Sequence, residues 1–172
     1  AGALAGTAFP IDREETARLL GFSGCVGNSL DAVASRDFAW ELMSAMTLTS
    51  LTWGRIAQDF YVWSTPEFGL IEFPDSLAGT SSIMPQKKNP VVIEYLKGKT
   101  SHLIGLLSTA LSAVKGTHFT HSGDGNRESM RSFWESSEEC LRCLVLFKLV
   151  IENAQPVEAT MLHKARSDFS TA

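Results

Sequence analysis

The sequence lacks the features that mark membrane, secreted and nucleic-acid-binding proteins. No uncharged apolar run reaches the roughly 18 residues that a membrane-spanning helix needs. The first ten residues have no basic flank of the kind that opens a signal peptide. Three cysteines do not suggest a disulfide framework, so the reducing cytoplasm is the expected compartment. The net charge of -4 argues against a nucleic-acid partner, although a local basic cluster could still bind a small anion.

Alternation with period two is nearly absent as well, and this excludes a β fold. Only a few residues near Leu70–Phe73 alternate. Apolar residues recur instead at steps of three and four, which predicts long helices over residues 29–64, 90–115 and 128–153. Capping residues and a late proline predict shorter helices over residues 12–21 and 157–166. The chain is therefore expected to be all-α.

Each long helix carries an apolar seam, and helices of this length need a bundle to cover their seams. Three such helices in 172 residues imply further helices from other chains, so an oligomer with a multi-chain helical core is expected. The seam residues are Phe38, Leu42, Met46, Thr49, Trp53, Ile56, Phe60 and Trp63; then Ile93, Leu96, Thr100, Leu103, Leu107, Ala110 and Val114; and then Met130, Phe133, Ser137, Cys140, Leu144 and Phe147.

The stretch GTSSIMPQKKNP, residues 79–90, is the most unusual local feature. Its composition also fits a solvated loop that leads into a helix, with Asn89 as the N-cap and Pro90 at the first helical position. However, Lys87 and Lys88 lie directly before a helix N-terminus, where the helix dipole disfavours cations. An anion bound there would gain from the lysines and from free main-chain N–H groups. The sequence thus predicts a mobile loop over residues 74–89 that binds a small anionic substrate.

SSIMPQKKNP resembles the signature of the fumarase/aspartase superfamily, whose members release fumarate by cleaving a C–N or C–O bond. GALAGTAFPIDRE at 2–14, NSLDAVASRDFAWE at 28–41 and EYLKGKTSHLIGLL at 94–107 are similar to the argininosuccinate lyase family in the same order. The resemblance implies an all-α, long-helix bundle of the fumarase/aspartase type. Residues 1–153 would form the second half of the central helical domain, and residues 154–172 the truncated start of a C-terminal helical domain.

The resemblance also implies a reaction and the residues that perform it. Argininosuccinate would be split into arginine and fumarate in a homotetramer whose active sites are shared between subunits, without a metal or another cofactor. Ser81 would be the general base, Lys87 would stabilise the carbanion intermediate, and the general acid would come from the family's N-terminal half. The implied substrate-binding residues are Asn89, Ser82, Arg36, Asn28 and Ser29.

The stretch GTHFTHSGDGNRESMR departs from the argininosuccinate lyase pattern. His121 stands where the family has tyrosine, Asn126 where it has glutamine, and Ser129 where it has lysine. We therefore expect His121 and Asn126 to face the substrate. The amine half of the substrate stays open between argininosuccinate and another N-substituted aspartate or succinyl-amine. A catalytically silent relative, like the lens crystallins that derive from this family, is the third possibility.

Overall fold

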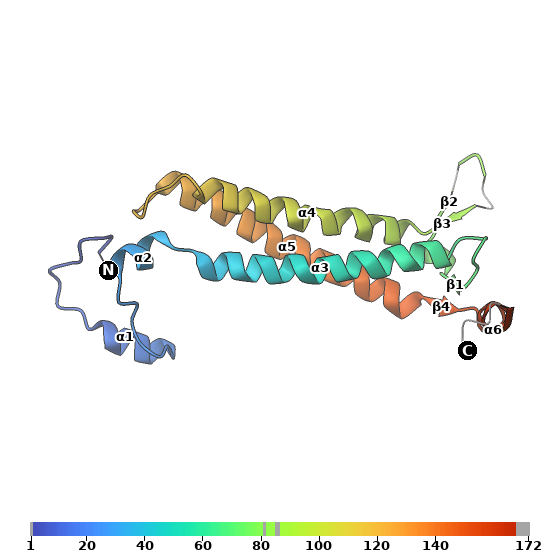
Figure 1. Ribbon diagram of the computed structural model, residues 1–172, viewed down its shortest axis with the longest axis horizontal. Coiled ribbons are helices and arrows are strands. Elements are labelled where there is room, and N and C mark those ends of the chain that lie inside the picture. The colour runs from blue at the N-terminus through green and yellow to red at the C-terminus, as the bar shows by residue number, and fades with distance from the viewer. Residues whose placement is uncertain (1, 81, 85–86, 168–172) are drawn as a thin grey trace.

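Three long helices form the body of the molecule. The computed structural model describes residues 2–80, 82–84 and 87–167. Helix α3 (Asp37–Trp63) runs along the bundle, α4 (Val91–Val114) returns beside it, and α5 (Gly123–Asn153) packs on both (Figure 1). The all-α prediction is confirmed, and none of the described helices is both long and apolar enough to cross a membrane.

Short helices and strands lie at both ends of this bundle. Helices α1 and α2 lie beyond one end, and two small antiparallel strand pairs and α6 lie at the other (Figure 1). Strand β1 pairs with β4, and β2 pairs with β3. The bounds are α1 Arg13–Leu20, α2 Ser29–Ala34, β1 Ile71–Glu72, a 3₁₀ turn Asp75–Leu77, β2 Gly79–Thr80, β3 Lys88–Asn89, β4 Gln155–Pro156 and α6 Glu158–Ser167.

The single helix predicted over residues 29–64 is wrong, because the chain breaks between α2 and α3. The Arg36 guanidinium donates hydrogen bonds to the carbonyl oxygens of Val33 at 3.0 Å and Ser35 at 2.6 Å. A continuous helix would offer those carbonyls to N–H groups four residues later. The side chain takes their place, and Ser35 adopts an extended backbone at the end of α2.

Helix α5 begins five residues earlier than predicted, so GDGN is a helical turn rather than a loop. A Cβ added to Gly125 would lie 2.5 Å from Thr117 Cγ2 and 3.2 Å from the Ala113 carbonyl oxygen. The glycine therefore lets the first turn of α5 lie directly against the end of α4, and this packing outweighs the low helix propensity of glycine.

The predicted seam is correct for α4 but displaced by one position on α3 and α5. Ile93, Leu96 and Leu103 of α4 are buried, whereas Phe38 of α3 is 68% exposed. The buried positions of α3 are Ala39, Met43, Thr47, Ser50 and Ala57, and those of α5 are Gly125, Ser129, Ser132, Ser136, Glu139, Cys143 and Val150.

Small side chains explain the displacement. Ser50 Oγ donates to the Thr47 carbonyl at 2.7 Å, so its hydroxyl is satisfied inside its own helix. A Cβ on Gly54 would lie only 3.0 Å from Thr100 Oγ1, which shows how closely α3 and α4 approach. Many of the buried positions of α3 and α5 are therefore small residues, and several bulky apolar residues occupy neighbouring faces.

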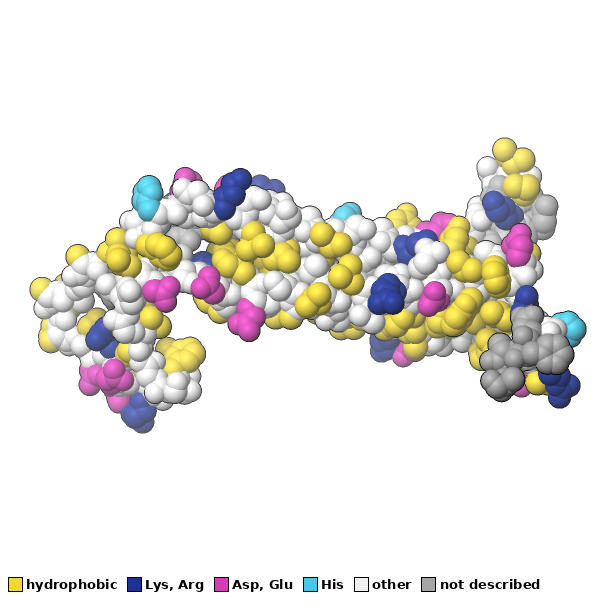
Figure 2. All heavy atoms as spheres, in the orientation of Figure 1, with side chains coloured by type: hydrophobic (Ala, Val, Ile, Leu, Met, Phe, Trp, Pro, Cys, Tyr) yellow, Lys and Arg dark blue, Asp and Glu magenta, His cyan; other side chains and the backbone are white. Residues whose placement is uncertain are grey.

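Many of those bulky residues are exposed in the single chain. Figure 2 shows hydrophobic side chains gathered along the length of the bundle on the face in view. Exposed large apolar residues on the long helices are Phe38, Leu42, Leu48, Leu51, Trp63, Tyr95, Ile104, Leu111, Trp134, Leu141, Leu144, Val145 and Ile151. By contrast, Cys143 lies in the core, where burial raises the pKa of its thiol to about 11, so the thiol stays protonated at neutral pH.

Candidate active site

The motif segment 79–90 leaves and re-enters the bundle through one strand pair. Gly79 pairs with Asn89 and Thr80 with Lys88, so the intervening residues form a loop closed at its base. Ser82 and Lys87 are exposed on this loop. Ser81, the predicted general base, lies outside the described residues. The predicted loop over residues 74–89 therefore contains a 3₁₀ turn and two short strands.

The two adjacent lysines of the motif have different surroundings. Lys88 forms an ion pair with Asp75, and the hydrogen bond from its ammonium to that carboxylate raises the pKa of Lys88. Lys87 donates its main-chain N–H to the Met84 carbonyl at 2.9 Å. Within the described part of the chain, the Lys87 ammonium forms no ion pair.

Asn89 is not the N-cap of α4, contrary to the sequence prediction. Pro90 occupies the cap position, Val91 begins the helix, and no side chain among the described residues caps its first N–H groups. Asn89 belongs to β3 and is half-buried, with its amide free of any capping role. Lys87 and Asn89 thus directly precede the start of α4, and free main-chain N–H groups at a helix start favour an anion.

Asn89 also lines a cavity of about 220 Å³ beneath the strand pair, together with Ser64, Glu72, Phe73 and Lys88. Pockets that enclose a small-molecule ligand are usually about 300–1,000 Å³. This cavity is smaller than that range. The cavity alone is therefore too small to enclose a typical small-molecule ligand.

Three further predicted substrate-binding residues, Asn28, Ser29 and Arg36, lie beyond the opposite end of the bundle. Asn28 caps α2, and its side-chain oxygen accepts from the N–H groups of Leu30 at 2.9 Å and Asp31 at 3.3 Å. Ser29 Oγ donates to the Leu4 carbonyl at 3.2 Å. Arg36 is half-buried and bonds main-chain carbonyls. In this chain all three therefore organise the local backbone.

His121 and Asn126 lie near that same end, where α4 turns into α5. His121 is exposed before the helix, and Asn126 is half-buried in the first turn of α5. Between them, the Ser122 hydroxyl donates to the Asp124 carboxylate and lowers the pKa of that group. This polar turn can present both side chains to a ligand.

One chain does not bring the two groups of predicted residues together. Helix α4 separates them, and its 24 residues span about 36 Å at 1.5 Å per residue. Strands β2 and β3, which close the motif loop, lie where α4 begins, and the turn from α4 into α5 lies at its other end (Figure 1). Asn89 belongs to β3, whereas His121 precedes α5 and Asn126 lies in its first turn. A single substrate molecule cannot touch both groups within one chain.

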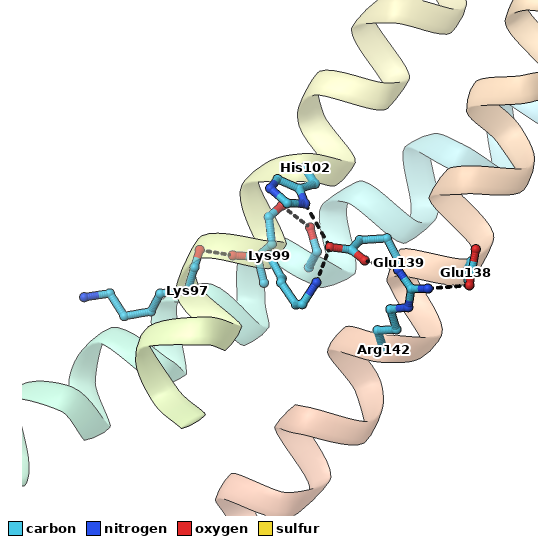
Figure 3. Close-up of polar contacts among 8 residues, drawn as sticks. Lys97, Lys99, His102, Glu138, Glu139 and Arg142 are labelled. Carbon is cyan, nitrogen blue, oxygen red and sulfur yellow. Dashed lines mark hydrogen bonds and ion pairs between the residues drawn. The ribbon is translucent and has the colours of Figure 1, made fainter. Parts of the chain in front are cut away.

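A buried carboxylate that the sequence analysis did not single out joins α4 to α5. Glu139 of α5 has a side chain only 8% exposed. Its Oε1 accepts from Lys99 Nζ at 2.9 Å and His102 Nδ1 at 2.8 Å, both from α4 (Figure 3). Because a carboxylate only accepts, His102 carries its proton on Nδ1. Arg142 lies 3.5 Å from Oε2 and also pairs with Glu138. The sequence indicates this cluster only through the spacing of Lys99 and His102, which are three residues apart and so share one helix face.

We expect Glu139→Gln to lower the free energy of unfolding by about 1–3 kcal/mol, because it leaves Lys99 beside a neutral partner in a largely buried site. Chemical denaturation followed by circular dichroism measures the change. Glu138→Gln is the matched control, since Glu138 is exposed and, among the described residues, forms an ion pair with Arg142 alone. Equal stability of the two variants would contradict a stabilising role for Glu139.

The same carboxylate predicts a pH dependence. Burial alone would raise the pKa of Glu139, but hydrogen bonds from Lys99 and His102 outweigh it and hold the pKa below the usual 4.5. A lowered folded-state pKa stabilises the fold above the unfolded value and loses that effect as the pH falls. The stability difference between wild type and Glu139→Gln should therefore shrink as the pH drops below about 4.5.

The bundle and its motif loop define a class, the lyases with a fumarase/aspartase-type helical core. EDDS lyase, solved as a variant with bound fumarate, matches 98% of this chain and 33% of its own with a TM-score of 0.83 and 30% identity. A class II fumarase from Schistosoma mansoni shares the fold, with a TM-score of 0.66 and 18% identity over 88% of this chain and 34% of its own.

Sequence comparison gives the family. The model of a family described as lyase matches residues 1–105, and the chain belongs to that family. Argininosuccinate lyase 1 of Shouchella clausii (strain KSM-K16) is 43% identical over 98% of this chain. The match covers 34% of that relative, so the chain spans about a third of the length of the curated proteins it resembles.

Proposed function

We propose that the full-length protein is a carbon–nitrogen lyase that converts argininosuccinate to arginine and fumarate. The observation that carries this proposal is the motif loop, in which Lys87 forms no ion pair with another described residue and precedes a helix start that no described side chain caps. The 43% identity to an argininosuccinate lyase supports the same reaction. We further propose the cytoplasm as its compartment and a reaction without a metal or another cofactor.

The proposed reaction is a β-elimination. Ser81, as an alkoxide, removes the proton from the carbon next to a substrate carboxylate. The electron pair left on that carbon forms the double bond of fumarate as the neighbouring C–N bond breaks. The departing nitrogen takes a proton from a general acid outside this stretch of chain. A serine is a weak base, so nearby main-chain donors and positive charge must favour its ionised form.

Lys87 and Asn89 stabilise the intermediate in this proposal. Loss of the proton spreads negative charge onto the carboxylate, which then approaches a dianion. The ammonium of Lys87 and the first main-chain N–H groups of α4 would stabilise that charge. Asn89 donates its amide to a carboxylate oxygen, and the exposed Ser82 hydroxyl offers a further donor.

We also propose that the active site is completed by other copies of the chain in a homotetramer. The motif loop and the group around His121 lie at opposite ends of a helix about 36 Å long. Another copy of the chain, packed along the bundle, can bring its own residues around His121 to the motif loop of the first copy. The exposed apolar residues of the three long helices supply the surface for such packing.

A second candidate is a lyase that acts on a different N-substituted aspartate or succinyl-amine. Two observations favour it. His121 and Asn126 replace residues of the argininosuccinate lyase pattern, and His121 is exposed while Asn126 is half-buried in the first turn of α5. The structural match to EDDS lyase shows that this fold also occurs in a lyase of another name. In this alternative the elimination chemistry is unchanged and only the amine half differs.

An activity assay separates the candidates. The full-length protein is incubated with argininosuccinate and with a panel of N-substituted aspartates, and fumarate is followed by its ultraviolet absorbance. Release of fumarate from argininosuccinate is the expected result. Turnover of another substrate alone would favour the second candidate. Absence of fumarate from every substrate would overturn both and leave a silent, crystallin-like structural relative.

A further inference from the structure

We propose that Lys88 and Asp75 are positioning residues, whose ion pair fixes the base of the motif loop so that Lys87 and Asn89 are held toward the substrate. The inference rests on the proposed lyase function. It gives Lys88 a task that differs from the one proposed for the adjacent Lys87.

The strand pair supplies the geometry. Lys88 lies opposite Thr80, and Asn89 lies opposite Gly79. Because successive side chains of a strand point to opposite faces, the side chain of Lys88 leaves the face opposite to that of Asn89. Holding Lys88 on one side therefore orients Asn89 toward the other.

Asp75 is a fixed anchor for that lysine. It opens the 3₁₀ turn Asp75–Leu77, in which the Leu77 N–H donates to the Pro74 carbonyl at 2.9 Å and the Ala78 N–H to the Asp75 carbonyl at 3.2 Å. The turn leads directly into β2. The ion pair therefore links the segment that enters the loop to the segment that leaves it.

Gly79 ties the same base to helix α4. A Cβ at this position would lie 2.2 Å from Val91 Cγ2, so the main chain of β2 lies directly against the first residue of the helix. The loop base, the ion pair and the start of α4 thus form one connected unit. A shift at any part of it changes the direction of Asn89 and of the adjoining Lys87.

Exposure of the pair indicates a geometric rather than a stabilising role. The side chains of Lys88 and Asp75 are 62% and 81% exposed. Exposed ion pairs contribute little to stability. A displacement of about 1 Å in a catalytic group, however, can lower a rate about 100-fold. Removing the pair should therefore change turnover much more than it changes stability.

The test compares Lys88→Met, Asp75→Asn and the exchanged pair Lys88→Asp/Asp75→Lys in the full-length protein. We expect each single variant to lower kcat about tenfold, with a smaller change in KM, because the loop base loses its orientation. Lys88→Arg and the exchanged pair should recover most of kcat. Lys148→Met is the control, since it removes another exposed lysine that pairs with Glu152.

Unchanged kcat in Lys88→Met, or no recovery in both Lys88→Arg and the exchanged pair, would overturn the proposal. Amide hydrogen exchange gives a readout that does not need a substrate. Asp75→Asn should speed exchange in the β2–β3 ladder and leave exchange in α5 unchanged. If the wild type releases no fumarate, the proposed function fails, and exchange still decides whether the pair holds the loop base. Unaltered exchange in the β2–β3 ladder of Asp75→Asn would show that the ion pair does not hold the loop base.

Gly79→Ala provides an independent variant of the same unit. Its new Cβ would push the loop base away from Val91, so kcat should fall. The double variant Gly79→Ala/Val91→Ala removes the opposing methyl group and should regain activity. If Gly79→Ala loses activity and the double variant does not regain it, the contact between the new Cβ and Val91 is not the cause of the loss.

Discussion

Replacing Ser81 with alanine is expected to abolish fumarate release and to leave the helical content unchanged. In the proposed elimination this hydroxyl accepts the substrate proton, and alanine has no group that can do so. Loss of a proton-transfer group costs about 10²–10⁴-fold in rate. Steady-state assays of the full-length protein measure the loss, and circular dichroism tests the fold.

Two neighbouring serines make this prediction specific. Ser82→Ala should retain more activity, because Ser82 is proposed only to donate a hydrogen bond. Ser76→Ala should behave as wild type, since Ser76 is exposed on the 3₁₀ turn and has no assigned role. Substantial turnover by Ser81→Ala would refute Ser81 as the general base.

Replacing Lys87 with methionine is expected to lower kcat about 10²–10³-fold, the range for deleting one donor to a developing oxyanion. Methionine keeps the length of the side chain and removes its charge. The loss should fall mainly on kcat, because the negative charge on the substrate carboxylate grows between the bound substrate and the intermediate.

Lys88→Met is the matched comparison for this variant. It removes the same charge one residue away, but from an ammonium already paired with Asp75. The proposed roles require the Lys87 variant to be clearly the slower of the two. Equal losses would show that the lysines act only through their summed charge.

Periodicity in the sequence predicted the helices well because each long helix has continuous apolar faces. It missed the break at Arg36, since no glycine or proline marks it. The break depends on a guanidinium that bonds the carbonyls of Val33 and Ser35. The seam of α3 was displaced because serine and threonine hydroxyls bond their own helix and can be buried at a close contact. A pattern of apolar residues does not reveal a buried helix face that is lined with serine and threonine.

The candidate site was predicted unevenly for a similar reason. The motif is contiguous, so its residues could be assigned by resemblance alone. The Lys88–Asp75 pair and the Glu139 cluster join residues far apart in the sequence and depend on how the chain folds back. The ends of α4 set the distance between the motif loop and His121, a relation that no local pattern expresses.

The length of helix α4 consequently fixes the distance between the motif loop and the turn that carries His121. If the motif loop of one copy meets the His121 turn of another, the length of this rod determines whether the two half-sites coincide. One inserted residue would advance everything beyond it by about 1.5 Å and rotate it by roughly 100°. Insertions and deletions between Val91 and Val114 should therefore disrupt the enzyme even at exposed positions where substitutions are harmless.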